Sequence, residues 1–132
     1  MKWVLCLALL ISPISSLALD RDCLAITVSR EAAAGNDRDG KAVLQVVENR
    51  MRIQGKNACA IVKQRKQFSF VTKDMSWKAT RKQLQYLLKL YEMEDVVTDK
   101  TTYFHNVSVK PKWAKQKKFV KQIFKHKFYE EK

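Results

Sequence analysis

A single glutamate, Glu31, has the sequence surroundings that general acid–base chemistry needs. It follows Ser29 and Arg30 at the end of an expected helix, and three alanines come directly after it. Small neighbours leave room for a substrate to approach the carboxyl group. Apolar neighbours raise the pKa of a carboxyl group by desolvation, which keeps it protonated near neutral pH. Glu31 is therefore the candidate proton donor, and the alternative is an ordinary solvated charge at a helix end.

Two groups of aromatic and polar residues have the composition of a sugar-binding surface. The CH faces of sugar rings stack on aromatic side chains, and sugar hydroxyl and N-acetyl groups bind amide, hydroxyl and imidazole groups. The candidate substrate-binding residues are Gln67, Phe68, Ser69, Phe70, Tyr103, Phe104, His105, Trp113 and His126. For the aromatic members the alternative is the packed side of a strand or hairpin. The alternative for His126 is a core histidine bonded to a backbone carbonyl.

Three helices are expected to position these residues. Asp20 can cap a first helix, which ends before Gly35. A second helix starts near Asp39, carries apolar residues at i, i+3, i+4 and i+8, and ends at Gly55. The pattern Thr80-x-x-Gln83 is a capping box in front of a third amphipathic stretch. The chain is therefore expected to be mostly helical, in one small domain.

The remaining segments predict a short sheet and a basic C-terminal helix. Residues 58–62 are apolar and fit one turn of helix or a strand. Residues 67–72 alternate polar and apolar types, and residues 96–109 are rich in valine and threonine, so both predict strands. Residues 112–125 have apolar residues at helical spacing among lysines, which predicts a final helix. The fold class expected from these segments is α+β with a short β-hairpin or sheet.

Residues 1–18 have the organisation of a secretory signal peptide. Lys2 precedes the apolar run 3–11, and Ser16-Leu17-Ala18 offers a small-x-small cleavage site. The run is shorter than the roughly 20 apolar residues that span a bilayer. We therefore expect an exported protein, located in the periplasm, the cell wall or outside the cell, with one domain over residues 19–132. An uncleaved anchor or a buried apolar helix is the alternative.

Removal of the signal peptide would leave two cysteines, Cys23 and Cys59, because Cys6 lies within it. An even pair in an oxidising compartment predicts a disulfide, with two buried free thiols as the alternative. By the chain-entropy argument such a bridge stabilises the fold by about 3–4 kcal/mol. Two cysteines and two scattered histidines lack the spacing of zinc ligands, so neither a metal nor a cofactor is expected.

The chain is strongly basic, with a formal net charge of +13. Such a charge predicts a polyanionic partner, and export favours the carboxylates of peptidoglycan or other anionic wall polymers over nucleic acid. Eight lysines crowd residues 110–127, next to an apolar stripe. The stripe could pack on the core and leave the lysines facing an anionic wall, or it could lie on an anionic membrane.

In its motif order the chain resembles the SleB/CwlJ family of cell-wall hydrolases, which includes spore cortex-lytic enzymes and phage-borne relatives. Residues 42–50 are similar to the family's AVAxVVxNR helix, and Glu31 lies where the family has the first glutamate of EARGE. The further similar segments are Cys59 to Val62 with CxVV, Gln67 to Phe70 with QFSW, Thr102 to Asn106 with THYH, Val109 to Trp113 with VxPxW, and Ile123 to Tyr129 with IGxHxFY. Four positions depart from the family: Ala33 and Ala34 near its Arg and Gly, Asn36 near its second glutamate, and Phe124 in place of a glycine.

The resemblance implies a lysozyme-like, monomeric enzyme that cleaves the glycan strands of peptidoglycan, with Glu31 as its acid. Two mechanisms remain open. A lytic transglycosylase needs one carboxyl group and makes an anhydro ring, whereas a muramidase needs Asp37 or Asp39 to activate water. The alternative function is a non-catalytic cationic protein that binds the cell wall or an anionic membrane surface.

Overall fold

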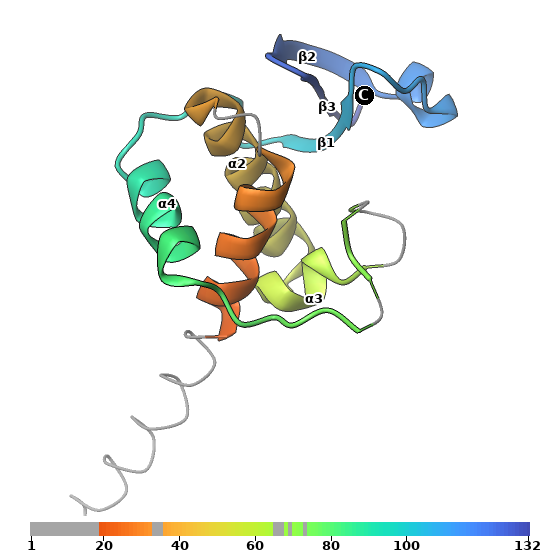
Figure 1. Ribbon diagram of the computed structural model, residues 1–132. Helices are drawn as coiled ribbons and strands as arrows, with labels where there is room; N and C mark the ends of the chain where they lie inside the picture. The colour runs from red at the N-terminus through yellow and green to blue at the C-terminus, as the bar shows by residue number, and fades with distance from the viewer. Residues whose placement is uncertain (1–18, 33–35, 65–67, 69, 73) are drawn as a thin grey trace, which may run out of the picture.

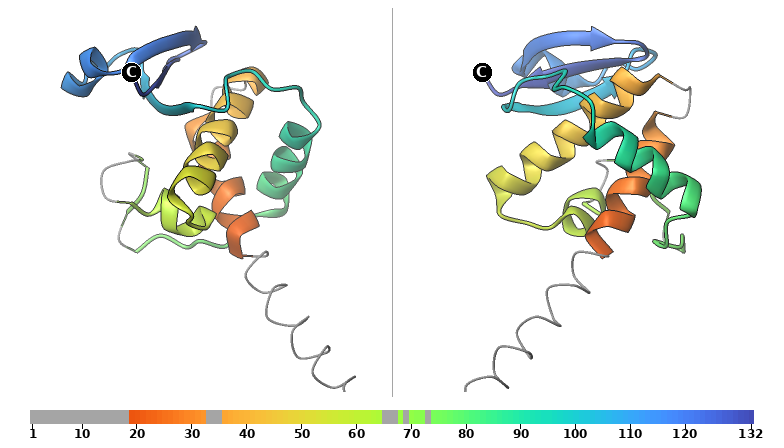
Figure 2. Two further views of the ribbon diagram at one scale, coloured as in Figure 1. Left: turned by 180° about the vertical axis from the view of Figure 1, so that it is seen from behind. Right: turned by 90° about the vertical axis from the view of Figure 1, so that its left-hand side faces the viewer.

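The computed structural model describes residues 19–32, 36–64, 68, 70–72 and 74–132. Helices form one part of the molecule, and a small sheet lies across one end of them (Figure 1). Figure 2 shows the same arrangement from two other sides. The end of the first helix, residues 19–31, and the beginning of the next helix both lie beside the sheet. The predicted α+β class is confirmed, and this junction is where the site is built.

Helix α2 (Asp37–Gln54) is the central element and contacts α3, α4, β1 and β2. Asn36 caps its beginning, with its side chain accepting a hydrogen bond from the backbone N–H of Asp39. Gly55 ends it in the left-handed conformation, at φ 62°, which glycine adopts without a steric cost. Val43, Val46 and Val47 are fully buried, as the apolar spacing predicts. The helix therefore supports two other helices and two strands of the sheet.

A disulfide joins the first helix to the short helix α3 (Ala58–Val62). It links Cys23 and Cys59, whose Cα atoms lie 5.2 Å apart, so the predicted pairing is present. Ile61 and Val62 of α3 are completely buried against α2. The bridge thus fixes the helix that carries Glu31 to the core of the domain.

Helix α4 (Arg81–Tyr91) begins with the predicted capping box, formed by Thr80 and Gln83. It buries Leu87 and Leu90, whereas Leu88 on its other side is 62% exposed, so the stretch is amphipathic as predicted. The helix packs closely on α2 at Gly40, where a Cβ atom would lie 2.2 Å from the hydroxyl of Tyr86.

The sheet has three antiparallel strands in the order β1 (Thr101–Asn106), β3 (His126–Glu130) and β2 (Lys118–Ile123). The central strand β3 is buried, with Phe128 inaccessible and His126 only 4% exposed. In the register, His126 lies opposite Asn106 of β1 and Ile123 of β2. The first residue of the central strand therefore points to the helix junction.

Polar side chains on α2 hold the chain that leads into β1. Gln45 donates to the carbonyl of Val97, and Asn49 donates to the carbonyls of Thr98 and Thr101. Arg50 donates to the carbonyl of Thr102 at 2.6 Å. All three side chains are buried, so these hydrogen bonds replace water that the backbone carbonyls have lost. They set the position of β1, which carries three of the predicted substrate-binding residues, Tyr103, Phe104 and His105.

The predicted helix over residues 112–125 is wrong. The chain instead forms a short 3-10 helix, η1 (Lys112–Gln116), followed by strand β2. Strand β2 pairs with β3 along its length, and this non-local pairing overrides the local helical spacing. Phe124 of the expected apolar stripe is consequently 44% exposed rather than packed on the core.

The strand predicted for residues 67–72 is also wrong in the part that can be described, since Phe68 and residues 70–72 lie outside any strand. Gln67 and Ser69 lie outside the described residues. The two aromatic rings instead anchor a loop: Phe68 packs on Phe104, and Phe70 packs on Trp77, with ring centroids 5.9 and 6.2 Å apart. An alternating polar and apolar pattern can therefore also arise in a non-strand segment whose apolar side chains pack against the rest of the domain.

Phe124, in the turn between β2 and β3, has a φ of 48°, which is sterically costly for a bulky residue. Replacing Phe124 by Gly is expected to raise the free energy of unfolding by about 0.5–1 kcal/mol, after allowing for the greater freedom of glycine in the unfolded chain. Urea unfolding measures the change. Lys125→Gly, at the next turn position with negative φ, is the control and should destabilise. Equal losses for both variants would contradict backbone strain at Phe124.

Candidate active site

Glu31 is the last helical residue of the first helix, and its side chain is only 12% exposed. Burial raises the pKa of its carboxyl group, since the charged form loses hydration. The charge of His126 partly opposes this rise in the pKa, and the nearby carboxylate of Asp39 adds to it. The net direction is upward, which is the property expected of a group that must deliver a proton near neutral pH.

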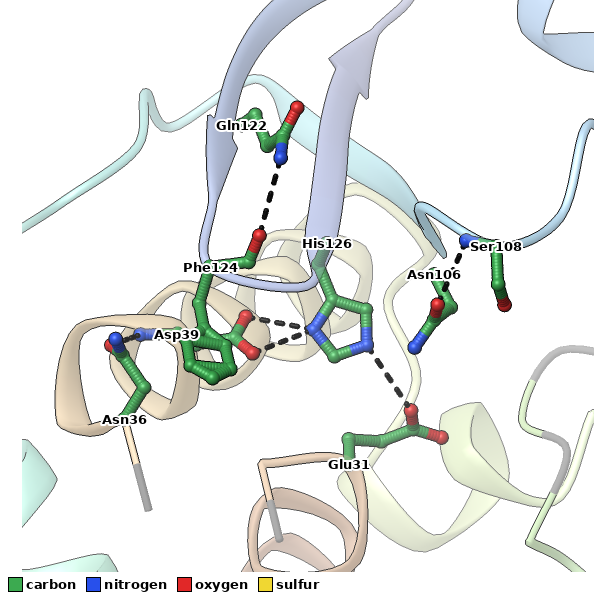
Figure 3. A network of polar contacts seen from close by, with 8 residues as sticks. All are labelled: Glu31, Asn36, Asp39, Asn106, Ser108, Gln122, Phe124 and His126. Carbon is green, nitrogen blue, oxygen red and sulfur yellow. Dashed lines mark hydrogen bonds and ion pairs between the residues drawn. The ribbon is translucent and has the colours of Figure 1, made fainter. Parts of the chain in front are cut away.

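His126 lies between two carboxyl groups (Figure 3). Its Nδ1 atom is 2.8 and 2.7 Å from the two oxygens of Asp39, and its Nε2 atom is 3.9 Å from the nearer oxygen of Glu31. A carboxylate only accepts hydrogen bonds, so Nδ1 carries the proton. In the neutral ring Nε2 then has a free lone pair directed at Glu31, and in the charged ring it has an N–H there.

The position of Asp39 is fixed from two sides. It lies in the first turn of α2, where the unpaired backbone N–H groups favour a negative charge. The cap from Asn36 holds its backbone, and the side chain is only 3% exposed. Asp39 therefore orients the imidazole of His126 rather than facing solvent.

A groove of about 880 Å³ opens from Glu31 and runs along β1 and η1. Its lining residues are Arg30, Glu31, Arg50, Tyr103, Phe104, His105, Asn106, Val109, Pro111, Trp113, Gln116, Lys117 and His126. Five of the predicted substrate-binding residues therefore meet in one groove with the predicted acid. They come from β1, η1 and β3, which shows how the sheet assembles them.

The aromatic side chains of the groove support one another. Trp113 packs against Tyr103 at 5.5 Å and edge-on against His105 at 5.6 Å between ring centroids. His105 stacks on Tyr129 and its Nε2 atom is 2.8 Å from the hydroxyl of that residue. Such a rigid aromatic wall suits the apolar faces of sugar rings.

Phe68 and Phe70 do not line the groove. Phe68 is 4% exposed and lies behind Phe104 and the guanidinium of Arg50. Phe68 therefore belongs to the core, and Phe70 is partly buried against that core.

The family model described as Cell Wall Hydrolase matches residues 25–129 of the chain. The chain belongs to the cell wall hydrolase family. The match covers Glu31 and every element that builds the groove, and it confirms the resemblance to SleB/CwlJ-type enzymes that the motif order indicated. No curated protein sequence matches this cell wall hydrolase.

Among solved structures, the hydrolase is similar to the catalytic domain of the germination-specific lytic transglycosylase SleB from Bacillus anthracis. The TM-score is 0.71 at 19% sequence identity, over 85% of this chain and 94% of that domain. This likeness shows that the two share a fold. The predicted lysozyme-like architecture with a small sheet is therefore confirmed.

Sequence patterns do not predict the roles of two site residues of this hydrolase. They offer Asp39 only as a base for water, whereas it binds His126, and Arg50 only as part of a motif, whereas it lines the groove. Both lie on the stripe of α2 that also holds Val43, Val46 and Val47. A charged residue at such a buried position is the signal that could have singled them out, since isolated buried charges are costly.

Proposed function

We propose that this protein is a lytic transglycosylase of peptidoglycan, with Glu31 acting in turn as general acid and general base. Protonated Glu31 donates to the glycosidic oxygen as the bond to the muramic acid breaks. The C6 hydroxyl of that sugar attacks its own anomeric carbon, and the Glu31 carboxylate takes the hydroxyl proton. The products are a 1,6-anhydro end and a new free C4 hydroxyl, and the enzyme returns to its starting state.

One observation carries this proposal: among the described residues that line the groove, Glu31 is the only one with a carboxyl group. Hydrolysis needs a second carboxylate, as nucleophile or as base for water. Asp39 is buried with both oxygens on His126, and Asp37 pairs with Lys89 at 2.7 Å. The two aspartates considered for a muramidase are therefore occupied elsewhere, and the intramolecular attack needs neither.

Substrate binding in this proposal combines the aromatic wall with a basic rim. Tyr103, His105 and Trp113 face the sugars, and Lys117 lines the same groove. Exposed lysines continue beyond the rim on η1 and the β2–β3 turn, among them Lys112, Lys115 and Lys125. A polyanionic wall polymer is attracted to such a surface, and salt screens that attraction.

The proposal includes export. Residues 1–18, which we interpret as the signal peptide, lie outside the described residues. In the part that can be described, no helix has the length and apolar character needed to cross a membrane. The Cys23–Cys59 bridge fits an oxidising compartment, where the wall lies.

Digestion of purified sacculi tests the proposal. We expect soluble fragments that end in 1,6-anhydromuramic acid, identified by mass spectrometry, together with a loss of turbidity. Reducing ends in place of anhydro ends would show a muramidase, with an unassigned group activating water. Binding without any soluble fragment would instead support the non-catalytic cationic protein.

A further inference from the structure

A second hollow lies on the other side of the groove wall from Glu31. It has a volume of about 320 Å³, within the usual range for small-molecule sites. Its lining residues are Arg50, Ile53, Gln54, Gln64, Lys100, Thr102, Tyr103 and Glu131. Arg50 and Tyr103 line both this cavity and the glycan groove, so they form the wall between them.

Arg50 is a buried cation with unused hydrogen-bonding capacity. Its side chain is 7% exposed, and within the described part of the chain its one hydrogen bond runs from Nε to the carbonyl of Thr102. Its Nη1 atom is buried and has no hydrogen-bond partner among the described residues. The rings of Phe68 and Tyr103 hold the guanidinium, each with its centroid 5.7 Å from the Cζ atom. The guanidinium is therefore held in place, and among the described residues its Nη1 atom is left without an acceptor.

No carboxylate neutralises Arg50 in the described part of the chain, and the other residues include neither Asp nor Glu. Glu131, the one acid of the cavity, is engaged by Lys117 at 2.9 Å and by the hydroxyl of Tyr103. Those hydrogen bonds lower the pKa of Glu131 and keep it a paired anion. With Lys100 at its rim, the cavity has an excess of positive charge.

We propose that Arg50 and this cavity form a carboxylate subsite for the branch that muramic acid carries at its lactyl group. This inference rests on the proposed function, which puts the glycan in the groove that shares Arg50 and Tyr103 with the cavity. A planar guanidinium binds a carboxylate through two parallel hydrogen bonds, which matches the unused edge of Arg50. The carboxylate belongs either to a free lactyl group or to a stem peptide attached to it.

Binding of soluble glycan strands to the Glu31→Gln protein tests the subsite without turnover. Three kinds of strand are compared by isothermal titration calorimetry: strands with stem peptides, strands stripped to free lactyl groups by an amidase, and stripped strands whose lactyl carboxyls are converted to amides. Carboxylate-bearing strands should bind about 10- to 100-fold more tightly than the neutral ones, the effect of charge-assisted hydrogen bonds. Tight binding of the stripped strands identifies the lactyl group, and tight binding of the peptide strands alone identifies the stem peptide.

Arg50→Gln in the same protein should reduce the preference for carboxylate-bearing over neutral strands to within about 2-fold, whatever it does to the affinity that all three strands share. Arg52→Gln is the matched control, because Arg52 lies on the same helix and binds the carbonyl of Asp99 but lines neither hollow. Lys100→Gln, at the exposed rim, should weaken only the carboxylate-bearing strands, by about 2- to 3-fold. It keeps the test valid if Arg50→Gln does not fold.

Equal binding of all three strands, or an equal loss for all three in Arg50→Gln, would overturn the subsite and leave Arg50 a purely structural residue. Failure of the proposed function gives a different result, because the wild-type protein would then leave the strands uncut or release fragments with reducing ends in place of 1,6-anhydro ends. The preference for carboxylates in the binding experiment does not depend on cleavage.

Discussion

Glu31→Gln is expected to abolish release of glycan fragments from sacculi, with a loss of at least about 1,000-fold in rate. The amide keeps the size of the side chain but can neither donate a proton to the glycosidic oxygen nor take one from the C6 hydroxyl. General acid–base catalysis contributes about 100- to 10,000-fold for one positioned group, and here one group would do both steps. Fragment release, followed by chromatography of anhydro ends, measures the loss.

Glu48→Gln is the matched control for this variant. Burial also raises the pKa of Glu48, but Glu48 does not line the groove. Its replacement should leave the rate unchanged. Near-normal cleavage by Glu31→Gln, or an equal loss in Glu48→Gln, would remove Glu31 from the mechanism.

The same Glu31 variant should be more stable than the wild type at neutral pH. Because burial raises the pKa of Glu31, the folded state holds its proton more tightly than the unfolded state. Stability of the wild type therefore falls as the pH rises from the ordinary glutamate pKa to the raised one. The advantage of Glu31→Gln should be present above that window and disappear below it, as urea unfolding at several pH values would show.

Local signals predicted the elements that end or begin at a particular residue. Gly55, and Thr80 with Gln83, act through hydrogen bonds or backbone conformations within a few residues of themselves. The helix end at Glu31 belongs to the same class, because it follows from the break after the alanines. Such features are visible in a sequence since their partners lie next to them.

Residues 112–125 show what local patterns cannot predict. Their apolar spacing fits a helix, but β3 offers a strand edge that pairs with residues 118–123. Phe124 then occupies the turn in a strained conformation, at a position where the resemblance expects glycine. The stabilisation from strand pairing depends on both segments, so the sequence of residues 112–125 alone cannot predict it.

The contact between Asp39 and His126 joins residues 87 positions apart. The sequence offered each as a candidate, one as a base for water and the other as a sugar ligand. Only the placement of β3 over the start of α2 shows that each holds the other. For the same reason the cavity behind Arg50 depends on β1 and the C-terminal Glu131, which meet only in the folded chain.

His126→Gln is expected to lower kcat by about 10- to 100-fold and to move the alkaline limb of the pH profile to higher pH. The glutamine amide can still donate to Asp39, but it carries no charge. The charge of His126 lowers the pKa of Glu31 in the wild type, so its removal lets that pKa rise further. A general acid with a higher pKa stays protonated to higher pH, but it donates its proton to the glycosidic oxygen less readily.

The chain's other histidine, His105, provides the control. It lines the same groove, where its ring atoms bind Tyr129 and the carbonyl of Asn106, but unlike His126 it forms no ion pair with Glu31 in the described part of the chain. His105→Gln should change KM without moving the alkaline limb. A purely structural role for His126 would lower kcat and leave the limb in place. An upward shift confined to His126→Gln therefore identifies the imidazole as the group that positions Glu31 and tunes its proton affinity.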